Sequence, residues 1–350
     1  MKIRKEITVL LAIITAVFIG MILLASQGYS PSQSYAGILK YSLSTSVGRA
    51  NTINRFVFLL ISGASAALAL GSGVSNLGQF GQILMGAMAS TLVGLYIDAP
   101  AFILIPLMII VGVVAGAAWA GVAALGKKLF GMNEFIITLM LNFIGDYFVR
   151  YLISTPLKDP GTQWPASRVV SDNGILPGFG NIDSAVFIMI FIYIIAVLFY
   201  KKTRVGYEFT IMGQNSIFAK TGGCETEKNF MRAMLLSGAL AGLLGAMLIC
   251  GATQQHRVIS GLGESFANDG LMVSIVAGNN IAGVFIYAAL FSVLQSGATG
   301  MQLDTGVPSE FTTMLIAITV LSVVAFRAYS GIFLDKLTAR RKTKKLEVDK

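Results

Sequence analysis

The chain has 350 residues, of which 55% are hydrophobic and only 12% are charged. Soluble domains carry about twice that charged fraction, so the composition excludes an ordinary soluble protein and indicates one that crosses a membrane several times. The net charge of +9 does not require nucleic acid as a partner, because many basic residues lie beyond Arg327, where the run ARRKTKK suits a cytoplasmic anchor beside anionic lipid.

The apolar segments predict an all-α polytopic membrane protein, a single integral-membrane domain over residues 1–350, with about ten transmembrane or partly re-entrant helices in two related halves. Two segments are short or interrupted by glycine for a bilayer that needs about 20 apolar residues, and we expect them to be broken or re-entrant. These are 79–96 and 266–278. The other segments are 7–25, 56–74, 102–124, 133–153, 184–200, 230–251, 281–298 and 309–327.

Basic residues predict the topology, because lysine and arginine in short loops are retained in the cytoplasm. They place both termini inside, including a basic cytoplasmic tail at 328–350. The first segment has no convincing cleavage site, so we expect it to remain as a span. One interval disagrees: 26–55 is assigned outside although it carries Lys40, Arg49 and Arg55. We keep this assignment because moving the interval inside would displace both tails or the later basic loop.

Small residues recur at helical spacing within several segments. Such stripes let helices approach closely in lipid, where packing replaces the hydrophobic drive. They predict a tight bundle and say nothing about a substrate. The stripes are Gly63/Ala67/Gly71, Gly86/Ser90/Gly94, Gly112/Gly116/Ala120 and Gly238/Gly242.

The stretch SNLGQFGQ, residues 75–82, joins the second and third predicted helices. Its amides Asn76, Gln79 and Gln82 alternate with glycines, a pattern typical of a helix break whose polar groups face a cavity. A cytoplasmic turn with a helix cap fits the same spacing, and both interpretations stay open.

The fifth predicted helix carries a polar stripe, because Thr138, Asn142, Asp146 and Arg150 follow one another at intervals of four residues. Asp146 and Arg150 can pair near the outer end. Asn142 lies near mid-membrane, where an amide needs a hydrogen-bonding partner. The stripe predicts either interhelical hydrogen bonding or the wall of a path.

The segment 154–183 is the longest outer interval and contains several prolines and Trp164. We expect an ordered extracellular loop that caps the bundle or receives a partner, since a plain connector would not need so many conformational locks.

The segment 201–229 is basic and therefore cytoplasmic. Its centre predicts a short helix with apolar anchors and glycine bends, shaped to dock on a partner; an amphipathic helix resting on the bilayer is the alternative. The anchors are Tyr207, Phe209, Ile211, Met212, Ile217 and Phe218, and the glycines are Gly213, Gly222 and Gly223.

The stretch FANDGLMVSIVAGNN, residues 266–280, surrounds another short segment with polar residues, among them Asn268 and Asp269. It predicts a discontinuous helix or two ordinary turns. No catalytic set is found: His256 is expected on an outer surface, and no metal-ligand spacing or phosphate-binding loop is present. Cys224 and Cys250 fall in a cytoplasmic loop and a span, so no disulfide is expected.

Several of these stretches together resemble one family. SNLGQFGQILMGA is similar to the N-I-G-x-E-G-Q-x-x-x-G-A segment of permease subunits in bacterial ABC importers of simple sugars, nucleosides and branched-chain amino acids. WAGVAALGKKLFGMNEFIITLMLNFI with PLKDPG, RVGYEFTIMGQNSIFAKTGG and GVPSEFTTMLIAITVLSVV resemble the nucleoside branch. The likeness covers residues 55–327. Leu77, Phe80 and Ile281 depart from the family's Ile, Glu and Pro.

The resemblance implies a transport subunit, not an enzyme, in a bacterial cell membrane, with no cofactor of its own. Its partners would be ABC ATPase subunits carrying ATP and Mg, a second permease subunit, an extracellular solute-binding lipoprotein and membrane lipid. Residues 201–229 would form the loop that couples to the ATPase. The coupling residues would be Tyr207, Phe209, Gly213, Ile217, Phe218 and Gly222.

A nucleoside is the predicted solute, with a simple sugar or branched-chain amino acid as alternatives and an ion-coupled transporter as another class. An importer served by a binding protein needs only weak contacts along its route. We therefore expect amides to line the path, with aromatic rings on which a base can stack. The expected path residues are Gln82, Asn142, Phe143 and Tyr147, and further Gln79 and Asn268.

Overall fold

The computed structural model describes residues 2–308 and 310–326, and side chains from Leu11 onward except that of Ile13. The protein is helical, as the composition predicts, with one short strand pair. The predicted basic tail at 328–350 lies outside the described residues. The helices are α1 (Lys2–Ser26), α2 (Pro31–Leu39), α3 (Ser46–Gly71), α4 (Gln79–Tyr96), α5 (Ala101–Phe130), α6 (Glu134–Ser154), α7 (Ala185–Lys202), α8 (Arg204–Gln214), α9 (Ser216–Thr221), α10 (Thr226–Cys250), α11 (Glu264–Val276) and α12 (Val284–Thr305).

Shorter elements lie between these helices. Lys40–Ser44 forms a π-helical turn and Asp172–Gly174 a 3-10 turn, while β1 (Gly178–Phe179) and β2 (Ile182–Asp183) form an antiparallel pair. Residues Glu310–Phe326 are also helical. Within the described residues, six helices are long and apolar enough to cross a membrane, namely α3, α5, α6, α7, α10 and α12.

The predicted boundaries are correct for α4 and within two residues for α6, α7 and α11, but not for the interval 26–55. We expected that interval to be an outer connection, whereas it contains α2, the π-helical turn and the first turns of α3. Polar residues near Asn51 and Arg55 lower the apolarity without breaking the helix. Hydropathy therefore locates the apolar part of α3, whereas the helix itself begins earlier in the chain.

The chain divides into two compact units. The first comprises residues 1–49 and 293–350. Its core consists of Leu24, Ile38, Met301 and Val307, all buried, with Tyr29, Tyr35, Leu294 and Phe311 packed against them. Close approach depends on small residues, because a Cβ added at Gly297 or Gly300 would overlap the backbone of α2. This explains glycine at both positions on α12.

The second unit, residues 50–292, is built around α10. In the apolar part of α10, 78% of the residues are buried, against 22% in α5. Helices α4 and α5 pack on α10 through the predicted small-residue stripes. A Cβ at Gly86 would lie 2.6 Å from the Gly242 Cα, and one at Gly242 would overlap the Gly112 carbonyl. The predicted close packing at these glycines is confirmed.

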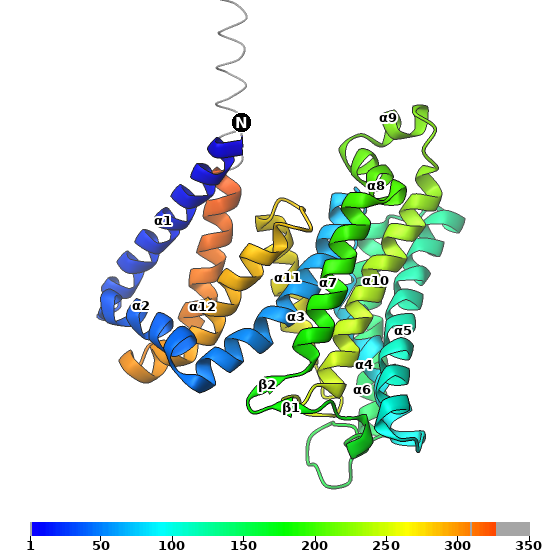
Figure 1. Ribbon diagram of the computed structural model, residues 1–350, viewed down its shortest axis with the longest axis horizontal. Coiled ribbons are helices and arrows are strands. Elements are labelled where there is room, and N and C mark those ends of the chain that lie inside the picture. The colour runs from blue at the N-terminus through cyan, green and yellow to red at the C-terminus, as the bar shows by residue number, and fades with distance from the viewer. Residues whose placement is uncertain (1, 309, 327–350) are drawn as a thin grey trace, which may run out of the picture. The chain divides into compact units, whose positions relative to one another are not determined.

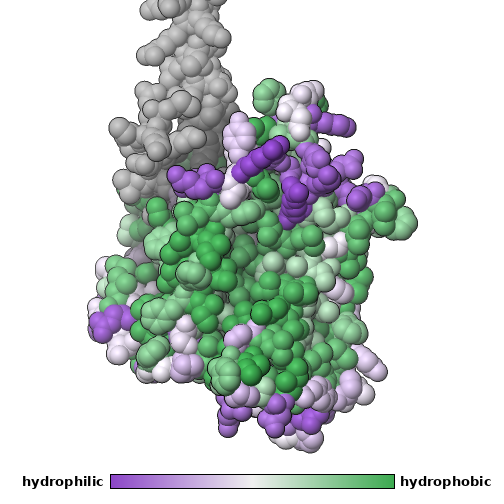
Figure 2. Space-filling model, turned by 45° about the vertical axis from the view of Figure 1, so that its right-hand side comes forward, coloured by the Kyte–Doolittle hydropathy of each residue, from purple (hydrophilic) through white to green (hydrophobic). Residues whose placement is uncertain are grey.

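The two ends of the second unit carry different structures (Figure 1). Helices α8 and α9 lie at one end of α7 and α10, and the β1–β2 pair lies at the other. Figure 2 shows a broad hydrophobic band between hydrophilic residues at the two ends. This pattern suits a unit whose middle lies in lipid and whose ends lie in water.

Candidate coupling surface and buried polar network

Helices α8 and α9 form two short, well-capped helices joined at Asn215. The Thr203 side chain accepts a hydrogen bond from the Gly206 N–H at 3.1 Å at the start of α8. The Asn215 side chain accepts one from the Phe218 N–H at 3.0 Å at the start of α9. These caps fix where each helix begins. The segment is therefore a defined surface and not a loose linker.

The apolar anchors of this segment point in two directions. Phe209 is fully buried, and its ring lies 6.4 Å from the Phe199 ring, centre to centre. In contrast, Tyr207, Ile217 and Phe218 are 66%, 76% and 64% exposed. We predicted all four as one set of coupling residues. Phe209 holds α8 on its own chain, and the other three present an apolar surface.

The two glycines of the predicted coupling set have different structural roles. A Cβ at Gly213 would overlap the Gly71 carbonyl, so the end of α8 lies directly against the end of α3. Gly73, which follows that helix, has a φ of +75° and also faces Gly213. Gly222 ends α9, and its N–H donates to the Phe218 carbonyl. The backbone of α8 thus contacts the backbone of the membrane-spanning helix α3 directly, with no side chain between them.

A polar cluster ties α8 to the start of α10. The Glu208 carboxylate accepts from the Arg204 Nε at 2.9 Å and from the Asn229 Nδ2 at 2.7 Å. Arg232 in turn donates to the Asn229 amide oxygen. These contacts hold the pKa of Glu208 below its ordinary value, with the Asn229 hydrogen bond contributing most and the Arg204 hydrogen bond next. Helix α8 is therefore anchored to α10 through Asn229 and, at Gly213, to the end of α3.

A cavity of about 390 Å³ lies beside this surface. Lys127 and Lys128 at the end of α5 line one part, and Met212 of α8 and Phe230 of α10 line another. Lys127 pairs with Glu134 at 2.9 Å, and its Nζ lies 4.2 Å from the centre of the Phe230 ring. The wall is thus partly basic and partly apolar.

The amides of the stretch 75–82 bond to one another and to neighbouring helices. Asn76 and Gln82 exchange hydrogen bonds of 3.1 and 2.9 Å between their amide groups. The Gln79 Nε2 donates to the Ser65 hydroxyl at 2.9 Å, and the Asn76 Nδ2 donates to the Ser237 hydroxyl at 2.9 Å. All three amide residues are buried. The predicted break before α4 therefore exists, and its amides are satisfied inside the protein.

Asn142 of α6 clamps the same break. Its Nδ2 donates to the Leu77 carbonyl at 2.8 Å, and its Oδ1 accepts from the Gly81 N–H at 2.8 Å. Thr138, one turn earlier, accepts from the Leu77 N–H at 3.3 Å. Of our two interpretations of the stripe, interhelical bonding is what the structure shows for these residues. A contact of Gln82, Gln79 or Asn142 with a solute stays a prediction.

The remaining predicted path residues are exposed. Phe143 and Tyr147 on α6 are 57% and 70% exposed, and Asn268 on α11 is also exposed. They do not join the buried amide network.

The predicted ion pair between Asp146 and Arg150 is confirmed, with 2.9 Å between the Arg150 Nε and the Asp146 Oδ2.

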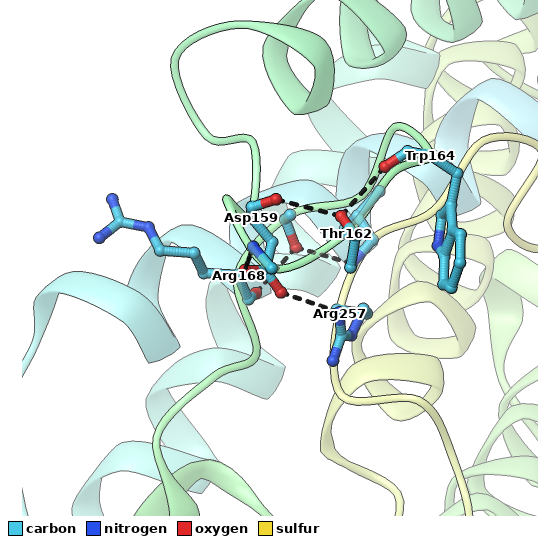
Figure 3. Close-up of polar contacts among 8 residues, drawn as sticks. Asp159, Thr162, Trp164, Arg168 and Arg257 are labelled. Carbon is cyan, nitrogen blue, oxygen red and sulfur yellow. Dashed lines mark hydrogen bonds and ion pairs between the residues drawn. The ribbon is translucent and has the colours of Figure 1, made fainter.

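The segment that follows α6 is held against the chain after α10 (Figure 3). Arg257 donates to the Asp159 carboxylate at 3.0 Å, and the Ser167 N–H donates to the Val258 carbonyl at 2.9 Å. The Thr162 hydroxyl bonds to the carbonyls of Asp159 and Trp164. The Trp164 side chain is 62% exposed. This end of the second unit therefore presents a fixed surface.

Sequence reasoning missed Ser65 and Ser237, whose hydroxyls lie 3.1 Å apart at the centre of the amide network. A single serine among small residues can form hydrogen bonds or only pack, and the sequence does not distinguish the two. It also missed Trp119, which lies against Gly81 and Gly145. In sequence its neighbours are all small and apolar, which predicts only lipid contact or packing.

A comparison with known protein families identifies the family of this chain. Residues 48–324 match the family described as the permease component of branched-chain amino acid transport systems. The chain belongs to this permease family. The resemblance indicated by the motifs is thereby confirmed, and the protein is a multi-pass transport subunit of an ABC importer and not an enzyme.

Three relatives show which members this permease is similar to. It is 30% identical over 323 residues to the guanosine ABC transporter permease NupP of Bacillus subtilis, covering 90% of this chain and 92% of NupP. It is 28% identical to the glucose ABC transporter permease TsgB13 of Haloferax volcanii, covering 94% and 90%. It is 28% identical to the nucleoside ABC transporter permease NupB of Lactococcus lactis, covering 97% and 95%.

Proposed function

We propose that this permease carries nucleosides into a bacterial cell. The observation that supports this most directly is the similarity to guanosine and nucleoside permeases over 90% or more of the chain. A simple sugar is the second candidate, because a glucose permease matches almost as well. Both classes of solute are neutral and carry several hydroxyl groups, whereas a branched-chain amino acid carries two charges.

The proposed topology places both termini in the cytoplasm and about ten membrane-embedded helices, in two related halves, in the cell membrane. Under it, α8 and α9 face the cytoplasm and the segment 154–183 faces outward. The lysines at the end of α7 and Arg204 at the start of α8 support this orientation. The separation of these two segments to opposite ends of the second unit is consistent with it (Figure 1).

We infer that α8 and α9 dock on a partner ATPase subunit, which would carry ATP and Mg. The exposed side chains of Tyr207, Ile217 and Phe218 supply the apolar contact surface, since aromatic and large aliphatic side chains contribute most at interfaces. Gly213 supports the transmission of movement, because it lets α8 touch the end of α3 directly. A second permease subunit completes the membrane part, and an extracellular binding protein docks on the segment 154–183.

The coupling assignment is tested by placing charge on the exposed surface. Ile217→Asp and Phe218→Asp should abolish retention of the ATPase on the purified permease while leaving insertion and abundance normal. Phe179→Asp is the matched control, because Phe179 is 63% exposed but lies on β1 at the opposite end of the unit. Equal retention in all three variants would remove the docking assignment.

The solute is tested by uptake in cells that express the whole importer. We expect ATP-dependent uptake of labelled guanosine, and competition by other nucleosides. If the cells take up glucose but not guanosine, the solute is a sugar and not a nucleoside. Uptake of leucine without either would contradict both candidates.

A further inference from the structure

Besides the Ser184 hydroxyl, two buried side-chain polar atoms of the second unit have no hydrogen-bond partner within the described part of the chain. They are the Nε1 of Trp119 on α5 and the Oδ1 of Asp146 on α6. Groups of this kind are rare in folded proteins, because an unpaired buried donor or acceptor loses the hydrogen bonds that water would have given it. Elsewhere in this region the polar groups are paired, as the Asn142 amide illustrates. The two exceptions therefore require an explanation.

The two groups come from adjoining places in the fold. A Cβ added at Gly145 would lie 3.6 Å from the Trp119 Nε1, and Asp146 is the next residue along α6. Glycine at position 145, and again at Gly81, leaves the room that the indole occupies. One atom is a donor only and the other, on an ionised carboxylate, is an acceptor only. Together they complement a group that both donates and accepts, which is the property of a hydroxyl.

The other oxygen of Asp146 is held by Arg150, whose Nε lies 2.9 Å away. The Asp146 side chain is only 15% exposed, whereas that of Arg150 is 50% exposed. Arg150 also interacts electrostatically with Glu264 of α11. A carboxylate within an apolar span is costly to keep, and such residues are usually functional. The pairing fixes the direction of the carboxylate and leaves its Oδ1 for another ligand.

An aromatic surface adjoins this pair. Tyr147, the residue after Asp146, is 70% exposed. Aromatic faces pack against sugar rings and nucleobases, and tyrosine adds a hydroxyl at its edge. The local groups are therefore a fixed carboxylate oxygen, an indole N–H and an aromatic ring, which is a set suited to a neutral polyhydroxylated solute.

We propose that Asp146 and Trp119 bind a hydroxyl group of the solute as it crosses the membrane, the Asp146 Oδ1 accepting from it and the Trp119 Nε1 donating to it. This inference rests on the proposed import of nucleosides or sugars, and it narrows the solute to one with ribose-like hydroxyls. It also moves the expected contact away from Gln82 and Asn142, whose amides are already bonded.

The chain allows a direct measurement, because it has only two tryptophans. In a Trp164→Phe background Trp119 is the sole tryptophan of this chain, and its emission reports on the indole N–H. The emission of the same assembly with Trp119→Phe added is subtracted to remove the tryptophans of the other proteins. The permease is assembled with its partner subunits in lipid nanodiscs, and D-ribose is the probe because it does not absorb where tryptophan does. We expect a saturable change in emission with D-ribose and none with L-leucine.

The response should disappear in Asp146→Asn, which keeps the shape of the side chain and removes its charge. Asp98→Asn, at an exposed aspartate between α4 and α5, is the matched control and should keep the response. An unchanged emission at every D-ribose concentration would overturn the proposal, as would a response that Asp146→Asn retains. In either case the two groups would only bond to each other or to water.

Uptake by the whole importer supplies the second arm. Trp119→Phe and Asp146→Asn should raise the KM for guanosine several-fold at normal abundance, whereas Asp98→Asn should not. An unchanged KM in both variants, with normal guanosine uptake by the parent, would overturn this inference and leave the proposed function intact. If the parent imports no guanosine, the nucleoside assignment fails, and the emission experiment still decides the hydroxyl site.

Discussion

The clamp that Asn142 places on the break before α4 gives a quantitative test of the fold. In Asn142→Leu the branching of the side chain at Cγ is kept, but the hydrogen bonds to the Leu77 carbonyl and the Gly81 N–H, each of 2.8 Å, are lost. The Gly81 N–H lies in the first turn of α4, where no helical carbonyl is available to it. Both backbone groups would then lack the partner that Asn142 supplies.

The magnitude follows from these two bonds. Interhelical hydrogen bonds in membranes contribute about 0.6 kcal/mol on average and reach about 1.7 kcal/mol. Gly81 is buried, so water cannot readily replace the lost acceptor, and the values at the upper end apply. We expect Asn142→Leu to lower the free energy of unfolding by about 2–3 kcal/mol.

The assay is unfolding of the purified permease in mixed micelles by increasing SDS, followed by circular dichroism. Asn268→Leu is the matched control, since it makes the same chemical change at an exposed amide on α11 and should alter the free energy of unfolding by less than about 0.5 kcal/mol. Equal losses in the two variants would show that the clamp contributes nothing specific, and the reasoning from its geometry would be refuted.

Two further predictions concern packing and pH. Gly242→Leu should prevent close approach of α10 to α4 and α5, because even a Cβ there overlaps the Gly112 carbonyl, and the yield of folded permease in detergent gel filtration should fall sharply. Glu208 has a lowered pKa, so its contribution to stability is present above the ordinary carboxyl pKa and is lost as the pH falls through its own lower value. The difference in melting temperature between the parent and Glu208→Gln should therefore be largest near neutral pH and shrink on acidification, whereas the exposed Glu225→Gln should show little difference at either pH.

The sequence predicts the helical class, most spans and the packing stripes, because these depend on apolarity and on spacing along one helix. It does not predict where α3 begins, since the polar first turns at Asn51 and Arg55 are helical without being apolar. It also does not predict that Phe209 turns inward while Phe218 turns outward. That difference depends on how α8 lies against α7, which is a tertiary contact and has no local signal.

The candidate site shows the same limit. Sequence spacing correctly places Asn142 and Asp146 on one face of α6, but it treats them as equivalent polar groups. The partners of the Asn142 amide, Leu77 and Gly81, are far away in the chain. The Asp146 carboxylate has one oxygen bonded to Arg150 on the same helix and one unbonded oxygen, and the spacing does not show this difference. Which polar group is satisfied is decided only by folding.

This distinction bears on how a permease passes a polar solute without trapping it. A side chain whose hydrogen bonds are all made within the protein, such as Gln82, would have to break them before it could bind a solute, and it gains little by the exchange. A group that folding leaves with one free acceptor or donor, such as Asp146 or Trp119, bonds a hydroxyl without breaking anything. Because the contact is to a single hydroxyl, it is weak and readily released. The stripe of α6 thus combines two roles at successive turns, with Asn142 fixing the break before α4 and Asp146 meeting the solute.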